Sequence, residues 1–233
     1  MDFVRRTLRF AGQQLVEWRD DQHGSDQATR FVARQLRVPP GARVCEAGCG
    51  TGVLALLAAR LCAGPVWATD VDARALALLR GAAGENQAAV TTCEGSWLAP
   101  LPPDQRFDLV VAVPPQKPAP HEFDLRYAAG EDGTRHLQTL CAEAAERLVP
   151  GGRLLLYHHS LADPALVERA LSRRFVWRTL AERWRWVATA SYAGGDPQLL
   201  AHLLARAARG DAQVWQHGAC LVWRGRVLEA RRR

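Results

Sequence analysis

The segment Val44–Leu61, VCEAGCGTGVLALLAARL, constrains this chain more than any other part of its sequence. A short apolar run contains Glu46, glycines follow at positions 48, 50 and 52, and an Ala/Leu-rich helical pattern comes next. A second apolar run then ends in Asp70. Glycines let a ligand approach the backbone, and an acidic residue at the tip of the second strand can accept hydrogen bonds from both ribose hydroxyls. The pattern predicts a strand, turn and helix that bind an adenosine-containing cofactor.

The composition predicts one α/β domain with additions, large enough to bury a full core. The chain has 233 residues, of which 48% are hydrophobic and 23% charged, as in ordinary globular domains. It lacks an uninterrupted apolar run of about 18 residues and an N-terminal apolar signal core, so we expect a cytoplasmic protein without a membrane span. The six cysteines include no CxxC pair, which predicts buried, reduced thiols and no metal site.

The charge is modestly basic, with a formal net charge of +6. Much of the excess is arginine in the last third of the chain, and nucleic-acid binding is one interpretation of it. Lys117 is the only lysine, which indicates a compositional bias towards arginine. We therefore favour a solvated, arginine-rich surface over a nucleic-acid interface.

The spacing of apolar residues, and of the residues that interrupt helices and strands, divides the chain into three predicted regions. Residues 1–38 are predicted to form an N-terminal helical cover, because apolar side chains recur at roughly helical spacing on both sides of the polar break at 20–26. Pro39-Pro40-Gly41 marks the start of the core, which we place at 39–182. Residues 183–233 are predicted to be a C-terminal insertion and final strand, with the insertion packed over the ligand cleft.

Within the core, predicted strands and helices alternate. This order implies right-handed crossovers and a Rossmann-like, doubly wound, mostly parallel α/β sheet. The strands are expected at 43–47, 66–70, 89–93, 107–113 and 152–158, and the helices at 51–61, 73–81, 134–149 and 164–175.

The acidic residue ahead of the glycines separates this motif from a nicotinamide or flavin site. Glu46 would be a poor neighbour for a pyrophosphate, but a good one for the α-ammonium of a methionine moiety. The combination of Glu46, the glycines and Asp70 resembles the ExGxGxG motif of class I S-adenosylmethionine-dependent methyltransferases. The run FDLVVAVPPQ, 107–116, resembles the FDLIVxNPPY strand of the HemK/PrmC-type methyltransferases. The match covers residues 40–160.

The resemblance implies a role for each matching residue. Glu46, Gly48, Gly50 and Gly52 would line the methionine side of S-adenosyl-L-methionine, and Asp70 would bind the ribose. The remaining cofactor contacts implied are Val71, Ser96, Trp97 and Val113. Two alternatives concern single residues: Asp70 could instead cap the following helix, although Asp72 suits that position better, and Trp97 could be an ordinary core residue.

The chain departs from the family at the substrate clamp, where Val113-Pro114-Pro115-Gln116 replaces Asn-Pro-Pro-Tyr. Valine has no side-chain acceptor and glutamine has no ring to stack. Methylation of an amide or of a base amino group is therefore disfavoured. The Pro114 carbonyl and the Gln116 amide are candidates for orienting a polar substrate, and His159 is the candidate base if the nucleophile carries a proton.

These observations predict an enzyme that methylates a small polar molecule by in-line displacement from S-adenosyl-L-methionine. Three alternatives are open. One is attack on another carbon of the sulfonium, with release of methylthioadenosine, and another is a protein or RNA methyltransferase. The third is a binding protein that keeps the cofactor without chemistry. Membrane partners are not expected, and the oligomeric state is open.

Two features outside the motifs are interpreted as structural and not as functional. In the run Arg183-Trp184-Arg185-Trp186, alternation at strand period favours tryptophans that face the core over a surface for base stacking. Trp215 and Trp223 are expected to pack likewise. The loop residues His121, Tyr127, His23 and Asp21 are further candidates for a catalytic role, and each by itself is interpreted as a surface residue.

Overall fold

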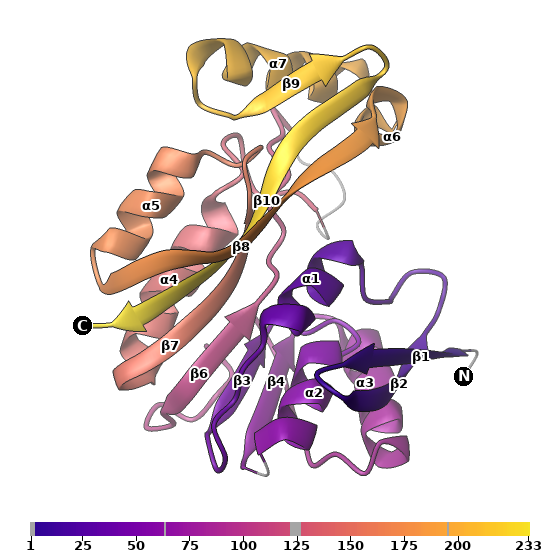
Figure 1. The fold of residues 1–233 in the computed structure, drawn as a ribbon, viewed down its shortest axis with the longest axis vertical. Helices are drawn as coiled ribbons and strands as arrows, with labels where there is room; N and C mark the ends of the chain where they lie inside the picture. The colour runs from indigo at the N-terminus through magenta and orange to yellow at the C-terminus, as the bar shows by residue number, and fades with distance from the viewer. Residues whose placement is uncertain (1–2, 63, 122–126, 195) are drawn as a thin grey trace.

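The computed structural model describes residues 3–62, 64–121, 127–194 and 196–233. Within these residues, an eight-stranded sheet has the order β5-β4-β3-β6-β7-β10-β8, with β9 paired to β10 (Figure 1). The strands of this sheet are β3 (Val44–Ala47), β4 (Val66–Asp70), β5 (Thr91–Glu94), β6 (Phe107–Ala112), β7 (Leu148–His159), β8 (Phe175–Ala188), β9 (Val214–His217) and β10 (Cys220–Arg232).

The first five strands along this order are parallel, and β10 is antiparallel to each of its neighbours. The strand order reverses between β3 and β6, and ligands of open α/β sheets bind at such a reversal, beyond the carboxyl ends of the strands. The predicted Rossmann-like α/β fold is confirmed. All four residues of β3 are buried, as expected for a central parallel strand covered on both faces.

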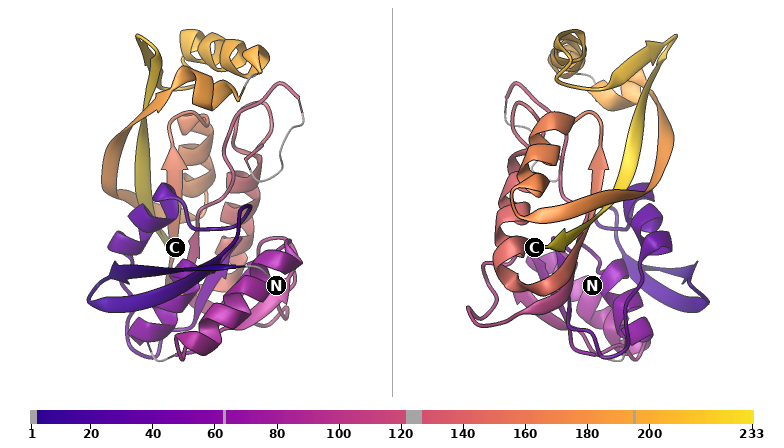
Figure 2. Two further views of the ribbon diagram at one scale, coloured as in Figure 1. Left: turned by 90° about the vertical axis from the view of Figure 1, so that its right-hand side faces the viewer. Right: turned by 60° about the vertical axis from the view of Figure 1, so that its left-hand side comes forward.

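Helices cover both faces of the sheet (Figure 2). One apolar core joins α1 (Gln27–Gln35), α2 (Val53–Cys62) and α3 (Ala73–Glu85) to one face, and a second joins α4 (Arg135–Arg147) and α5 (Pro164–Ser172) to the other. Asp72 and Asp163 cap α3 and α5, since each carboxylate accepts hydrogen bonds from two backbone N–H groups of the first turn. Among the described residues, the helices are too short or too polar to cross a membrane.

The N-terminal segment differs from the prediction. Of the expected helical cover, 27–35 is helical, whereas β1 (Val4–Phe10) and β2 (Gln13–Arg19) form an antiparallel hairpin. Leu8, Phe10 and Leu15 are buried on one face of it. Their spacing has the two-residue period of a strand, which is easily read as helical in so short a segment. The connection, Ala11-Gly12, has positive φ at both residues, 48° and 77°, the twist that a tight hairpin requires.

The C-terminal region extends the two longest strands beyond the core. Above them, α6 (Thr189–Ala193), α7 (Pro197–Arg209) and β9 form a small unit with an apolar core of its own (Figure 1). Trp223 is buried in that core as predicted. The prediction for Trp184, Trp186 and Trp215 is wrong, because all three are exposed. Alternation does separate two faces of β8, but α6 and α7 cover the face opposite these tryptophans.

Gly52 illustrates how the glycine turn controls packing. A Cβ atom at Gly52 would lie 2.3 Å from Leu79 Cδ1 of α3, and the residue has φ +72°. We expect Gly52→Ala to lower the free energy of unfolding by about 1–3 kcal/mol through overpacking and left-handed strain. Gly84→Ala is the matched control, because it is an exposed helical position with open space at its Cβ; it should stabilise by about 0.5–1 kcal/mol. Urea denaturation measures both, and equal changes would contradict the packing role of Gly52.

Candidate active site

A pocket of about 770 Å³ opens at the carboxyl ends of β3, β4 and β6, where the strand order reverses. Its lining includes eight of the residues predicted to contact the cofactor: Glu46, Gly48, Gly50, Asp70, Val71, Ser96, Trp97 and Val113. A second hollow of about 740 Å³ is lined by residues of 36–39 and 149–153 and by none of the predicted site residues. The first pocket is therefore the candidate site.

The glycine turn forms the floor of the pocket. Gly48, Gly50 and Gly52 have φ values of +67°, +52° and +72°, a region that other residues rarely adopt. A Cβ at Gly48 would lie 2.9 Å from Trp97 Cζ3, whereas a Cβ at Gly50 would meet open space. Gly52 does not line the pocket. It packs against Leu79 of α3, and its contact with the cofactor stays a prediction.

Asp70 is held rigidly at the end of β4. One carboxylate oxygen accepts a hydrogen bond from the Gly50 N–H at 2.7 Å, and the other accepts one from the Asp72 N–H at 3.0 Å. Asp72, in turn, caps α3 by accepting from the N–H groups of Arg74 and Ala75. The prediction that Asp72 serves as the cap is confirmed. The Asp70 carboxylate lines the pocket, and its oxygens have lone pairs left to accept hydrogen bonds from two neighbouring hydroxyl groups.

Glu46 is only 3% exposed, and its carboxylate accepts a hydrogen bond from the Ala55 N–H at 2.6 Å. Burial raises the pKa of Glu46 to about 8, and the nearby Asp70 carboxylate adds to the shift. A buried carboxyl with such a pKa gains most from a cationic ligand, because a positive charge offsets the cost of ionising it. Glu46 thus has the electrostatics expected of a partner for an ammonium group.

Trp97 forms a wall of the same pocket. It has φ +47° and is 9% exposed, and its ring lies 5.4 Å from that of His136. The backbone carbonyl of Trp97 accepts a hydrogen bond from the Thr69 hydroxyl at 2.5 Å. Both interpretations of this residue hold: Trp97 packs in the core and also lines the pocket. Val71, 69% exposed, lies at the rim.

The polar segment 20–26, which we call the strap, forms a side of the pocket that the sequence did not predict. Gln22, His23, Gly24, Ser25 and Asp26 all line it. The sequence signal was weak, since these residue types are also those of an ordinary loop ahead of a helix, and Asp26 does cap α1. Tyr127, Arg135 and His136 complete the lining from the other side.

A fully buried carboxylate anchors the strap to the glycine turn. Glu17 of the hairpin accepts hydrogen bonds from the Thr51 hydroxyl at 2.7 Å and from Arg6 Nε at 2.8 Å. It also accepts from the backbone N–H of Ser25. Because a buried charge is tolerated only when it is paired and hydrogen-bonded, these partners hold three separate parts of the chain together.

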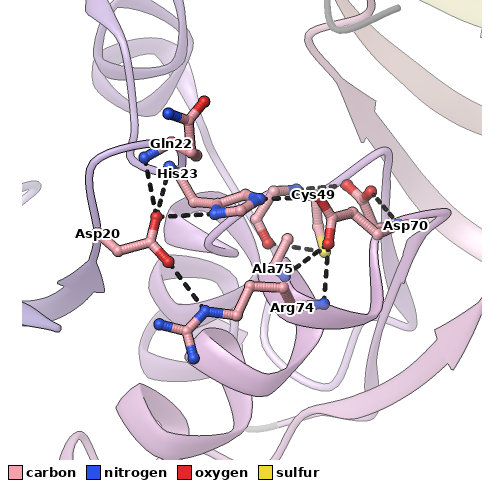
Figure 3. A network of polar contacts seen from close by, with 9 residues as sticks. Asp20, Gln22, His23, Cys49, Asp70, Arg74 and Ala75 are labelled. Atoms are coloured by element: carbon pink, nitrogen blue, oxygen red, sulfur yellow. Dashed lines mark hydrogen bonds and ion pairs between the residues drawn. The ribbon is translucent and has the colours of Figure 1, made fainter. Parts of the chain in front are cut away.

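His23 fastens the other end of the strap (Figure 3). Its Nδ1 lies 2.8 Å from Asp20 and its Nε2 lies 2.8 Å from Asp72, the cap of α3, while Arg74 Nε donates to Asp20 at 2.9 Å. Burial alone would lower the pKa of His23, but the hydrogen bonds to Asp72 and Asp20 outweigh it, so the pKa is raised. His23 is therefore part of the pocket wall and not the surface residue that we expected.

The three residues predicted as catalytic do not line the pocket. The Gln116 amide is buried and donates hydrogen bonds to the carbonyls of Pro114 at 3.1 Å and Tyr157 at 2.9 Å. Its oxygen accepts from the His159 N–H at 3.0 Å. Gln116 therefore ties the loop after β6 to β7, and its amide uses one of the two lone pairs of the Pro114 carbonyl. Burial lowers the pKa of His159 to about 4, so the imidazole is neutral at pH 7 but lies outside the lining.

The C-terminal insertion does not reach the pocket. Every lining residue lies between positions 22 and 136, so the expected packing of the insertion over the cleft is not found among the residues that the structure describes. Within the same residues, no group of three or more His, Cys, Asp or Glu side chains is arranged to hold a metal ion. The pocket thus offers several acidic groups, Glu46 and Asp70 among them, together with a glycine floor, an aromatic wall and a polar strap.

Comparison with known proteins identifies the family of this chain. The family model described as the methyltransferase small domain matches residues 22–180. The release factor glutamine methyltransferase of Deinococcus radiodurans is 42% identical over 178 residues, which cover 65% of this chain and 63% of that protein. The ribosomal protein L11 methyltransferase of Burkholderia cenocepacia is 32% identical over 173 residues, 72% of this chain and 49% of that protein. The chain thus spans about half to two thirds of the length of these curated relatives.

The solved structures show the same fold. A 16S rRNA methyltransferase of Thermus thermophilus, in complex with AdoMet and guanosine, aligns with a TM-score of 0.64 at 18% identity and covers 99% of this chain and 51% of that one. The YcgJ protein of Bacillus subtilis aligns with a TM-score of 0.62 at 15% identity, over 88% of this chain and 97% of that one. The fold is that of the S-adenosylmethionine-dependent methyltransferases. The chain belongs to the methyltransferase small domain family, and the predicted resemblance is confirmed.

The residues present fit S-adenosyl-L-methionine, the cofactor of this class. At pH 7 the raised pKa keeps most of Glu46 protonated before the cofactor binds, and an ammonium beside it would favour the ionised carboxylate. We expect cofactor binding to release close to one proton. Calorimetry of S-adenosylhomocysteine binding in buffers of different ionisation enthalpy measures this release. Glu46→Gln should abolish the release and weaken binding by about tenfold or more; an unchanged release in that variant would assign the proton elsewhere.

We also expect the strap to contribute to cofactor affinity. His23→Ala removes the link between the strap and α3, so we expect the dissociation constant for S-adenosylhomocysteine to rise by about 2–10-fold, the cost of a net hydrogen bond. Arg9→Ala is the control, because Arg9 makes an exposed hairpin contact to Gln14. Equal affinities for the two variants in calorimetry would show that the strap does not shape the pocket.

Proposed function

We propose that this chain transfers the methyl group of S-adenosyl-L-methionine to a side chain of a protein. The supporting observations are that the pocket lining, within 22–136, lies inside the residues that the family model matches, 22–180, and that two relatives aligned over more than half of this chain are methyltransferases named for a release factor and a ribosomal protein. These names favour a macromolecular acceptor, the alternative in our sequence analysis, over a small polar molecule.

The cofactor side of the pocket needs few side chains. In the proposed arrangement, Glu46 pairs with the α-ammonium, Asp70 accepts from the ribose hydroxyls, and Trp97 packs beside the adenine. The bound cofactor supplies an activated methyl group on a sulfonium. The pocket then has to hold the acceptor in line and exclude water, which can account for most of the acceleration.

The acceptor side differs from that of the amide-methylating family that the sequence resembles. Val113 and Pro115 line the pocket, and valine offers no acceptor for a planar N–H group. The Pro114 carbonyl accepts a hydrogen bond from the Gln116 amide, and neither residue lines the pocket. An acceptor other than a glutamine amide is therefore favoured, one that positions itself by shape against an apolar wall.

The test uses S-adenosyl-L-methionine labelled in the methyl group and an extract of cells that lack this gene. We expect label in material that is retained by ultrafiltration, resists ribonuclease and is destroyed by protease, with S-adenosylhomocysteine as the nucleoside product. Asp70→Ala should reduce the label at least about tenfold. Label that ribonuclease destroys would show that RNA is the acceptor, and label that passes the filter would show that a small molecule is. Formation of methylthioadenosine would overturn methyl transfer.

A further inference from the structure

Three exposed tryptophans form one surface on the C-terminal region. Trp184, Trp186 and Trp215 are 55%, 61% and 50% exposed. In the register of the sheet, Trp184 pairs with Arg224, and both Trp186 and Trp215 pair with Val222. Directly paired residues share a face of an antiparallel sheet. The three rings therefore lie side by side on one face of the β8-β10-β9 sheet.

These side chains contact one another. The Trp184 and Trp215 rings lie 5.5 Å apart, and the Trp186 and His217 rings lie 5.7 Å apart. The Arg224 guanidinium lies 5.9 Å from the centre of the Trp184 ring. We call the set Trp184, Trp186, Trp215, His217 and Arg224 the aromatic face.

The position of this face in the fold leaves it uncovered. On the opposite side of the same strands, Leu221 and Trp223 are buried in the small core with α6 and α7. The aromatic face is the outer side, and among the described residues no helix packs on it. Large apolar groups that remain exposed together in this way mark an interaction site.

The chemistry of the face favours bases over aliphatic side chains. Val222, the aliphatic residue paired with both Trp186 and Trp215, is itself only 8% exposed. What reaches the solvent is therefore flat rings with a guanidinium and an imidazole between them. Aromatic rings interleaved with cationic groups are the usual platform for single-stranded nucleic acids, because every base has a face that can stack.

The charge of the region agrees with a polyanionic partner. Residues 183–233 contain nine arginines against three acidic residues, a net charge of +6. Residues 1–182 contain 21 basic and 21 acidic residues. The whole positive excess of the chain therefore lies in the segment that carries the aromatic face. Of these arginines, Arg224 belongs to the face itself and is close to Glu182, at 3.8 Å. Arg183 and Arg185, by contrast, lie on the opposite face of β8 and donate to Gln27.

We propose that the aromatic face binds single-stranded nucleic acid, with bases stacked on Trp184, Trp186 and Trp215 and a phosphate attracted by Arg224 of the same face. This inference goes beyond the proposed function and does not depend on it. The face lies outside the cofactor pocket, whose lining ends at His136, so binding there can be measured without any methyl transfer.

The experiment measures the anisotropy of labelled oligonucleotides of about 12 nucleotides, oligo(U) and oligo(dT), with the full chain at about 50 and about 200 mM salt. We expect binding that weakens with salt. Each of Trp184→Ala, Trp186→Ala and Trp215→Ala should weaken it by about fivefold or more, because stacking contributes about 1–3 kcal/mol per base. Trp184→Phe should retain most of the affinity, and preference for one oligonucleotide would distinguish RNA from DNA.

Val176→Ala is the matched control, since Val176 is exposed on the same strand, at 65%, and lies outside the aromatic face. All variants should bind S-adenosylhomocysteine as the wild type does, which shows that they fold. No binding at low salt, or binding unchanged in the triple tryptophan variant, would overturn the inference. So would concentration-dependent dimerisation that the triple variant abolishes, because the face would then be an interface between two copies of the chain.

Discussion

The turn from β3 into α2 is the constraint on which the rest of the structure depends. Three glycines with positive φ let the chain leave the central strand, bring α2 against α3 and leave open space above Gly50. The Gly50 N–H then fixes the Asp70 carboxylate of the neighbouring strand. One local conformation thus sets the helix packing, the floor of the pocket and the orientation of an acidic group.

Electrostatics organise the pocket around this turn. Glu46 is buried with little to stabilise its charge, whereas the buried Glu17 is hydrogen-bonded on several sides. The difference in hydrogen bonding between Glu46 and Glu17 gives these two buried carboxyl groups different roles. Glu17 holds the hairpin, the strap and the glycine turn together, and Glu46 is left to respond to a cationic ligand. A sulfonium cofactor that also carries an ammonium suits such a site, because its positive charges meet acidic groups where water is excluded.

The acceptor side shows that a familiar sequence position can change its role. Gln116 stands where the amide-methylating family has an aromatic ring, and its amide turns inward to join Pro114, Tyr157 and His159. The loop is thereby fixed, and the Gln116 amide does not line the pocket. Methyl transfer from an activated sulfonium does not require a polar side chain here, because holding the reacting atoms in line accounts for more of the rate acceleration than general base catalysis does.

The sequence by itself determined the parallel core and placed Glu46, the glycine turn and Asp70 together at the pocket, because these depend on local patterns: buried strands, a glycine turn, and acidic residues at strand tips. It also predicted Asp72 as a helix cap, a contact within four residues. Only the tertiary structure decided the hairpin at the N-terminus, the strap with His23, and the exposed side of Trp184 and Trp186. Each of these depends on which distant element covers a face or completes a hydrogen bond: Glu17 meets Thr51 across 34 positions and His23 meets Asp72 across 49. Alternation along a strand shows that two faces differ, but the packing of other elements decides which of them is buried.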